Sequence, residues 1–362
     1  MNRYSLLLIL FSLTYIALPN NILAQDNNNG LQDTIKVLTK KDKQIAEKKY
    51  NEGVIMLQSN KYHDAISLFD QALKVRVKFP EAFYNRASAK FLSKNYVGAI
   101  QDYNAAITLK PNAKYYLARA ISRYKYNELP GAKLDLDKAI SLDSGAVRND
   151  AYYYKGCVQF LEKNYGEAIK SFTSTIENDD KYTFAYHDRG SCNRMLEKYQ
   201  LALIDYRKAI QLDPNLSMAF NNIASVKKLM KDYQGAITDY TSAISVDTAS
   251  ALSYNNRGTV YKELEEYDKA LADFNKAIKI DANYAIAYGN RANLSFAKKD
   301  YQAALLDYNK ALELDANYGL GYLNRGICKE MLRDDTGACK DWSKADALGV
   351  SVAGDYLNAQ CK

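Results

Sequence analysis

The chain has 362 residues, with 49 Lys and Arg against 42 Asp and Glu, and both signs of charge are interspersed along its length. This mildly basic distribution lacks the basic stripe of a nucleic-acid-binding surface, so no nucleic-acid partner is predicted. The sequence has two histidines and lacks paired-cysteine metal motifs, glycine-rich phosphate loops and nucleophile elbows. It therefore predicts no enzyme activity, no cofactor, no metal site and no small-molecule substrate.

The N-terminal segment has the pattern of a secretory signal peptide. Arg3 precedes an apolar run from Leu6 to Leu18, and PNNILAQ follows, with cleavage expected after Ala24. The run is too short to span a membrane comfortably; an uncleaved anchor is the alternative. We therefore expect residues 1–24 to be removed and the protein to be exported, to a periplasm or, alternatively, to the exterior or a secretory lumen. Membrane association is expected only through an uncleaved leader or a partner.

Residues 25–45 are polar and rich in asparagine, and we expect a flexible leader and the start of the first helix there. One pattern then recurs nine times at intervals of 33 to 36 residues, most clearly in the stretch from Tyr254 to Ala282. We number each copy so that its central alanine is position 20. These alanines are Ala65, Ala99, Ala132, Ala168, Ala202, Ala236, Ala270, Ala304 and Ala338. The copies cover about 46–79, 80–112, 113–148, 149–182, 183–216, 217–250, 251–284, 285–318 and 319–350, and residues 351–362 remain as a C-terminal cap.

Within each copy, small and large apolar residues recur at fixed positions. Gly or Ala occupies position 8 in every copy, as in Gly258, and position 24 is aromatic in eight of the nine, as in Phe274. Small residues at these crossing points allow two helices, A and B, to pack closely, and the aromatic ring fills the space between them. We therefore assign these positions to packing and not to function.

Charged residues also recur as a pair. Six copies carry Arg at position 7, and all six carry Asp at position 23, as in Arg291 and Asp307. The first and fourth copies lack both members. This joint presence and absence predicts an ion pair between helices A and B, whose main effect would be to fix their relative orientation.

These features identify the chain as a member of the tetratricopeptide-repeat family: small residues at positions 8, 20 and 27, an aromatic residue at 24, tyrosine at 17 and an occasional proline at 32. The resemblance covers about 46–350. It implies an all-α fold, an α-solenoid of nine helix-turn-helix repeats wound as a right-handed superhelix, with a short C-terminal capping helix. It also implies a concave groove lined by the A helices, where family members bind peptides or protein segments.

Helix A positions that packing does not use, namely 2, 5, 6, 9 and 12, should face that groove. Asn at position 6 recurs in four consecutive repeats, similar to the asparagine ladder of the protein O-glycosyltransferases. Amides both donate and accept, so such a row suits a peptide backbone; the alternative is that these asparagines are simply solvated. Earlier repeats offer aromatic residues instead. The predicted peptide-binding residues are Asn221, Asn222, Ser225, Asn255, Asn256, Thr259, Asn290, Asn293, Asn324, Tyr84, Tyr153 and His187.

The resemblance implies a non-enzymatic protein-interaction scaffold or co-chaperone-like adaptor that binds a protein or peptide segment. The alternatives are a membrane-tethered envelope assembly factor with an uncleaved anchor and, less favoured, an accessory subunit of an enzyme complex. The terminal run ACKDWSKADALG, closed by Cys361, resembles the ends of exported bacterial members. If the cap folds back in an oxidising compartment, Cys339 can bridge to Cys361; a Cys328 to Cys339 bridge is the other possibility.

Overall fold

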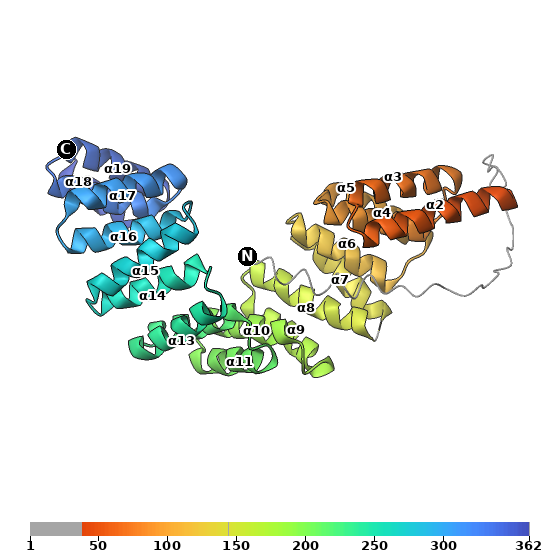
Figure 1. Ribbon diagram of the computed structural model, residues 1–362, viewed down its shortest axis with the longest axis horizontal. Coiled ribbons are helices and arrows are strands. Elements are labelled where there is room, and N and C mark those ends of the chain that lie inside the picture. Colours follow the sequence, from red (N-terminus) through yellow and green to blue (C-terminus); the bar gives the residue numbers. More distant parts are fainter. Residues whose placement is uncertain (1–37, 144, 362) are drawn as a thin grey trace. The chain divides into compact units, whose positions relative to one another are not determined.

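The computed structural model describes residues 38–143 and 145–361, and all regular structure in these ranges is helical. The predicted all-α solenoid of nine helix pairs with a C-terminal capping helix is confirmed (Figure 1). The predicted signal peptide and most of the predicted leader lie outside the described residues. The first described helix begins at Lys40, within residues 25–45, where the leader and the start of the first helix were expected.

Each repeat contributes one A helix and one B helix. The A helices are α2 Lys40–Gln58, α4 Pro80–Leu92, α6 Ala113–Lys125, α8 Ala146–Leu161, α10 Thr183–Met195, α12 Ser217–Leu229, α14 Ala251–Glu263, α16 Ala285–Ala297 and α18 Gly319–Met331. The B helices are α3 Tyr62–Val75, α5 Tyr96–Leu109, α7 Leu129–Leu142, α9 Tyr165–Asn178, α11 Tyr199–Leu212, α13 Tyr233–Val246, α15 Tyr267–Ile280, α17 Tyr301–Leu314 and α19 Asp335–Ala347. The capping helix is α20 Val352–Gln360.

The helices form two compact units, divided between Cys192 and Asn193 near the end of α10. Within each unit, a B helix packs against its own A helix and against the A helix of the next repeat. Successive A helices also contact one another, from α2 to α8 in the first unit and from α12 to α18 in the second. Each unit therefore has one face built from A helices alone.

The predicted packing positions form the core. The rings at position 24 are at most 3% exposed, and the small residues at position 8 lie directly over them. At Gly258, an added Cβ would come within 2.8 Å of Phe274 Cε1, so the ring requires the absence of a side chain there. The aromatic ring at position 24 and the small residue at position 8 thus set how closely helices A and B approach.

Each turn between helices A and B contains one residue with positive φ, always at position 15 and never glycine. These residues are Asn60, Lys94, Asn127, Lys163, Glu197, Lys231, Glu265, Lys299 and Arg333, with φ between 58° and 66°. The left-handed conformation helps to reverse the chain within the three residues between the two helices, and it is energetically unfavourable for residues with a Cβ. The packing of helix A on helix B must therefore offset the conformational free energy of the positive-φ residue at every turn.

The predicted ion pair between positions 7 and 23 is confirmed in both units. Arg291 donates from Nε and Nη2 to the two carboxylate oxygens of Asp307, both at 2.7 Å. Its Nη1 donates to Asn275 Oδ1 on the preceding B helix, also at 2.7 Å. This third contact, to position 25 of the previous repeat, was not predicted. One guanidinium therefore joins three helices, which we call the arginine staple.

The staple recurs with Asp70, Asn104, Thr241, Asn275 or Asn309 as the acceptor at position 25. The fourth repeat has Lys155 in place of the arginine and keeps only the contact to the previous repeat. Lys155 Nζ donates to Asp137 Oδ1 at position 25 of the third repeat (2.7 Å). Between the fifth and sixth repeats, position 25 is Arg207 and position 7 is Ile223. There, Ile223 packs in an apolar cluster with Leu203, Tyr206 and Val226 of α11 and α12.

The arginine staple leads to a stability prediction. Replacing Arg291 or Asp307 by Ala should each lower the free energy of unfolding by about 2 kcal/mol, because the remaining partner is left half-buried without its hydrogen bonds. The double variant should lose less than the sum, by about 1 kcal/mol or more, in urea denaturation.

The matched control is the exposed pair Lys310 and Glu313 on α17, whose side chains are 40% and 68% exposed. Its coupling energy should stay at about 0.5 kcal/mol or less. Strictly additive losses at Arg291 and Asp307 would show that the pair does not act as a unit.

Candidate functional site

The A-helix face of the second unit carries most of the predicted binding residues. It comprises positions 2, 6 and 9 of α12, α14, α16 and α18, helices that contact one another in sequence. Position 6 is Asn in all four, namely Asn222, Asn256, Asn290 and Asn324. Positions 2, 6 and 9 lie three or four residues apart, so they share one side of a helix.

The asparagines bond to one another between neighbouring helices. Asn290 Nδ2 donates to Asn255 Oδ1 (2.9 Å), and Asn324 Nδ2 donates to Asn293 Oδ1 (3.1 Å). Asn256 Nδ2 donates to Asn221 Oδ1 at 3.3 Å. These amides therefore link one A helix to the previous one, a role that the sequence did not indicate.

Some hydrogen-bonding capacity is left on this face. Within the described residues, Asn290 Oδ1 and Asn324 Oδ1 accept no hydrogen bond, and each Nδ2 uses one of its two hydrogens. Both side chains are partly exposed. The row can therefore still donate to and accept from an added backbone.

Other predicted residues are occupied by internal contacts. Asn221 and Asn255 are 6% and 2% exposed, so almost none of their surface can touch a ligand. Ser225 Oγ hydrogen-bonds with the Tyr240 hydroxyl, and Thr259 Oγ1 accepts from Lys228 Nζ at 2.9 Å. The participation of these residues in binding stays a prediction.

Sequence reasoning missed a row of aliphatic side chains beside the amides. Position 2 of the same helices is Met218, Leu252, Ile286 and Leu320, and the last three are 50%, 46% and 56% exposed. Each lies one helical turn before an asparagine of position 6. In the second, third and fourth repeats, position 2 is Glu81, Lys114 and Asp150 instead. The signal in the sequence was this joint occurrence of an aliphatic residue at position 2 and Asn at position 6.

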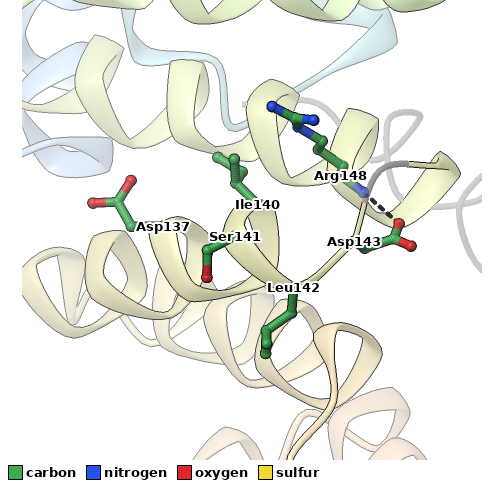
Figure 2. Close-up of a pocket in the computed structure, with 6 residues that line it drawn as sticks. All are labelled: Asp137, Ile140, Ser141, Leu142, Asp143 and Arg148. Atoms are coloured by element: carbon green, nitrogen blue, oxygen red, sulfur yellow. Dashed lines mark hydrogen bonds between the residues drawn. The ribbon is translucent and has the colours of Figure 1, made fainter.

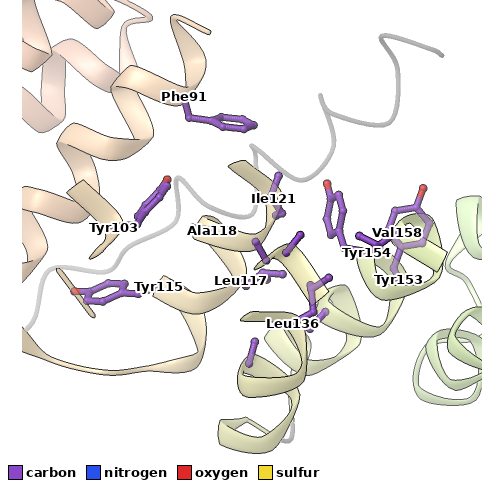
Figure 3. Close-up of a cluster of buried hydrophobic side chains, with 14 of the residues drawn as sticks. Phe91, Tyr103, Tyr115, Leu117, Ala118, Ile121, Leu136, Tyr153, Tyr154 and Val158 are labelled. Atoms are coloured by element: carbon purple, nitrogen blue, oxygen red, sulfur yellow. The ribbon is translucent and has the colours of Figure 1, made fainter. Parts of the chain in front are cut away.

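The aromatic residues predicted to line the first unit lie in its core. Tyr84, Tyr153 and His187 are 4%, 3% and 6% exposed. Tyr84 stacks on Tyr115 with ring centroids 4.9 Å apart. Figure 3 shows Tyr115, Tyr153 and Tyr154 among the buried side chains of this cluster. Their surfaces are used in packing, and a ligand contact would require the cluster to open.

Cys157, Asp188 and His187 lie near one another in the first unit but do not form an activated nucleophile. Asp188 accepts from the Tyr153 hydroxyl at 2.9 Å and lies 2.8 Å from His187 Nδ1. Burial raises the pKa of the Cys157 thiol well above its ordinary value, and the Asp188 carboxylate raises it further. An activated cysteine needs the opposite shift, because the thiolate is the nucleophile.

A shallow depression lies at the junction of α7 and α8, where the link between repeats is two residues longer and α8 has 16 residues instead of the usual 13. Its lining residues are Asp137, Ile140, Ser141, Leu142, Asp143 and Arg148. Figure 2 shows these side chains pointing in different directions. Asp143 accepts from the Arg148 backbone amide (3.1 Å), and Asp137 bonds Lys155. The depression therefore lacks convergent polar groups for a ligand.

Two further searches covered the described part of the chain. In residues 38–143 and 145–361, no three His, Cys, Asp or Glu side chains gather in a way that could hold a metal ion. Over the same ranges, every helix is too short or too polar to cross a membrane.

Comparison with known proteins places these features in a family. Models described as tetratricopeptide repeat match residues 50–114, 183–216, 251–284 and 285–318. The chain is 34% identical over 125 residues to RNA polymerase II-associated protein 3 of Xenopus tropicalis, covering 34% of this chain and 18% of that protein. It is 26% identical over 136 residues to Hsp70-Hsp90 organizing protein 3 of Arabidopsis thaliana, covering 34% and 24%. The matched segment thus spans about a fifth of these relatives' length.

A solved tetratricopeptide repeat protein from Parabacteroides merdae has a similar fold. Its TM-score is 0.58 at 20% sequence identity, and the match covers 69% of this chain and 99% of that one. At this identity, the likeness bears on the fold alone.

Asp150, at position 2 of the fourth repeat, provides a pH-dependent test. Burial raises its pKa from 3.8 to about 6; the Tyr182 hydroxyl at 3.4 Å opposes this and nearby Asp179 adds to it. The folded state thus prefers the protonated acid, and the stability that protonation provides is lost as the pH rises from about 4 through 6. Asp150→Asn should therefore match the wild type at pH 4 and exceed it by about 1 to 3 kcal/mol above pH 7.

Urea denaturation across this pH range measures the difference. Asp268→Asn, at a carboxylate that is 98% exposed, is the control and should change the free energy of unfolding only slightly. A difference at Asp150 that does not grow between pH 4 and 7 would contradict the assignment.

Proposed function

Because the chain belongs to the tetratricopeptide-repeat family, we propose that it is a protein-interaction scaffold that binds an extended segment of a partner protein on the A-helix face of its second unit. The observation that carries this is the pairing of two rows on that face: exposed aliphatic residues at position 2 and asparagines at position 6. The amide row would hydrogen-bond the backbone of the segment, and the aliphatic row would contact its side chains.

The spacing of the helices indicates what the segment would look like. Neighbouring packed helices lie about 8–10 Å apart. A polyproline chain advances about 3.1 Å per residue with three residues per turn, so residues three apart lie on one side of it and span that distance. The position 2 residues of successive A helices would then contact ligand side chains that are three residues apart. These residues are Leu252, Ile286 and Leu320. The proposed ligand is a segment with an apolar residue at every third position.

A co-chaperone-like adaptor is the finer form of this proposal. Relatives matched over part of their length include the Hsp70-Hsp90 organizing protein 3 named above, whose name describes an organizing role for that protein. The aliphatic row at position 2 and the amide row at position 6 can contact a ligand. Neither row contains a nucleophile beside an activating base, which supports a non-enzymatic role. The first unit would then contact the same partner, or a second partner, through surfaces other than its A-helix face.

Export is a second part of the proposal. Cys339 Sγ and Cys361 Sγ form a disulfide with Cα atoms 5.7 Å apart, the first of the two pairings left open by the sequence, and Cys328 is a free thiol. Disulfides persist in oxidising compartments such as a periplasm, a secretory lumen or the exterior. This bond supports an exported location, with the periplasm preferred. N-terminal sequencing of the protein from its own cell tests it, since a first residue of Gln25 is expected after cleavage.

The aliphatic row gives a binding prediction. The probe is a synthetic 12-residue peptide with Leu at every third position and Ser and Gln elsewhere, labelled for fluorescence polarisation. The variant carrying Leu252→Ala, Ile286→Ala and Leu320→Ala should bind it roughly tenfold more weakly or worse, because three half-exposed aliphatic contacts are removed. Its urea denaturation midpoint should stay close to that of the wild type.

The matched control removes aliphatic residues that are at least as exposed from B helices of the same unit. The changes are Leu201→Ala, Ile204→Ala and Leu306→Ala, at residues that are 50%, 59% and 71% exposed. This variant should bind as the wild type does. A peptide with Leu at every second position should bind less well than the probe. Equal loss in both triple variants, or no dependence on Leu spacing, would reject this face as the binding surface.

A further inference from the structure

The capping helix α20 occupies the place of a tenth A helix. It packs on α19 as α12, α14, α16 and α18 each pack on the B helix before them. Tyr356 lies on Trp342 with ring centroids 4.9 Å apart, and Ala353 is fully buried against the same cluster. We propose that the Cys339–Cys361 disulfide is a redox-controlled latch, whose reduction releases α20 and uncovers the end of the last repeat.

The other contacts of α20 are weaker than those of the A helices it resembles. Among the described residues, no ion pair and no side-chain hydrogen bond joins α20 to α19, whereas Arg325 of α18 donates to Asn309 Oδ1 of α17, the B helix before it, at 2.8 Å. Ala353 is the one residue of α20 that is buried completely. Leu357 and Tyr356 are only partly covered. The disulfide is therefore the main restraint on the cap.

The helix is also too short to persist alone. It has nine residues, and its N-cap, Ser351, makes no side-chain capping hydrogen bond. Isolated helices shorter than about 12–15 residues are marginal in water. Once the covalent link is broken, α20 keeps its helical form only while it stays docked, so undocking and unfolding of the cap occur together.

The chemistry of release is thiol–disulfide exchange with a dithiol reductant. Both cysteines are partly exposed, so a thiolate can reach the bond. One thiolate of the reductant attacks a sulfur of the disulfide, and the other cysteine leaves as a thiolate that takes up a proton. The second thiol of the reductant then closes its own disulfide and releases the first cysteine. Two electrons and two protons pass to the protein, which gains two thiols.

Release of α20 would also affect α18, which carries part of the proposed binding face. The latch itself does not require that face to bind a ligand. Trp342 lies under Gly326 of α18, and an added Cβ at Gly326 would be 2.6 Å from Trp342 Cδ1. Leu323 of α18 belongs to the same apolar cluster as Trp342 and Tyr356. Loss of α20 removes Ala353, Tyr356 and Leu357 from this cluster and loosens the contact of α18 with α19. The neighbouring Leu320 and Asn324 would then be held less firmly.

Tryptophan fluorescence of the full chain tests the latch, because Trp342 is the only tryptophan and is 1% exposed. The oxidised protein is compared with protein reduced by dithiothreitol under native conditions. Reduction should shift the emission to longer wavelength and raise the acrylamide quenching constant several-fold. Amide hydrogen exchange should increase in α20 first, then in α18 and α19, while α12 to α15 stay unchanged.

Two variants separate the latch from other effects of the reductant. Cys339→Ser with Cys361→Ser should show the shifted emission without any reductant and should not respond to it. Cys328→Ser, which removes a nearby free thiol, should respond as the wild type does. Emission and exchange that are the same before and after reduction, or a double serine variant that retains the buried emission, would overturn the proposal. None of these readouts uses a ligand, so they stand apart from the peptide-binding test.

Discussion

The arginine at position 7 is the interaction that orders the stack of helices. Its guanidinium has five donors in a rigid plane, so one side chain can hold the Asp of its own B helix and an acceptor on the previous B helix at once. The Arg291 and Asp307 side chains are partly buried, which strengthens their hydrogen bonds and penalises the loss of either partner. The same guanidinium therefore sets the orientation of helix A relative to its own B helix and relative to the B helix of the previous repeat.

The junction between the fifth and sixth repeats lacks this arginine and shows what replaces it. Between α11 and α12, Ile223 stands at position 7 and joins Leu203, Tyr206 and Val226 in an apolar cluster, while Asp239 pairs with Lys227 of its own repeat. Exchanging a buried ion pair for well-packed apolar side chains is often neutral for stability. The exposed Arg207 at position 25 could not have accepted a hydrogen bond from an arginine, so both sides of the junction differ together.

The sequence predicted the features that repeat with one residue type. Period, the ring at position 24 and the pair of positions 7 and 23 are visible because Ala, aromatic, Arg and Asp recur by name. Position 25 was missed because its acceptors are Asp, Asn and Thr, which share a function but no residue type. Position 15 was missed because seven of its nine residues are Lys, Glu or Arg, which give no signal of positive φ; Asn60 and Asn127 alone favour it. The asparagine row was found, but its bonds between helices depend on distances that only the structure supplies.

The two ends of the array differ in a way that the repeat pattern explains. Position 10 packs under the preceding B helix and is buried in the later repeats, as at Val226, Val260 and Leu294. In the first repeat this position is Ile55, which is 56% exposed because no B helix precedes it among the described residues. An array of nearest-neighbour contacts leaves one such apolar surface at each end. At the C-terminal end, the nine-residue helix α20 covers this apolar surface, although it is shorter than the A helix of a full repeat. Over the part of the chain that the structure describes, no arginine staple holds α20 to α19, and the Cys339–Cys361 disulfide joins them instead.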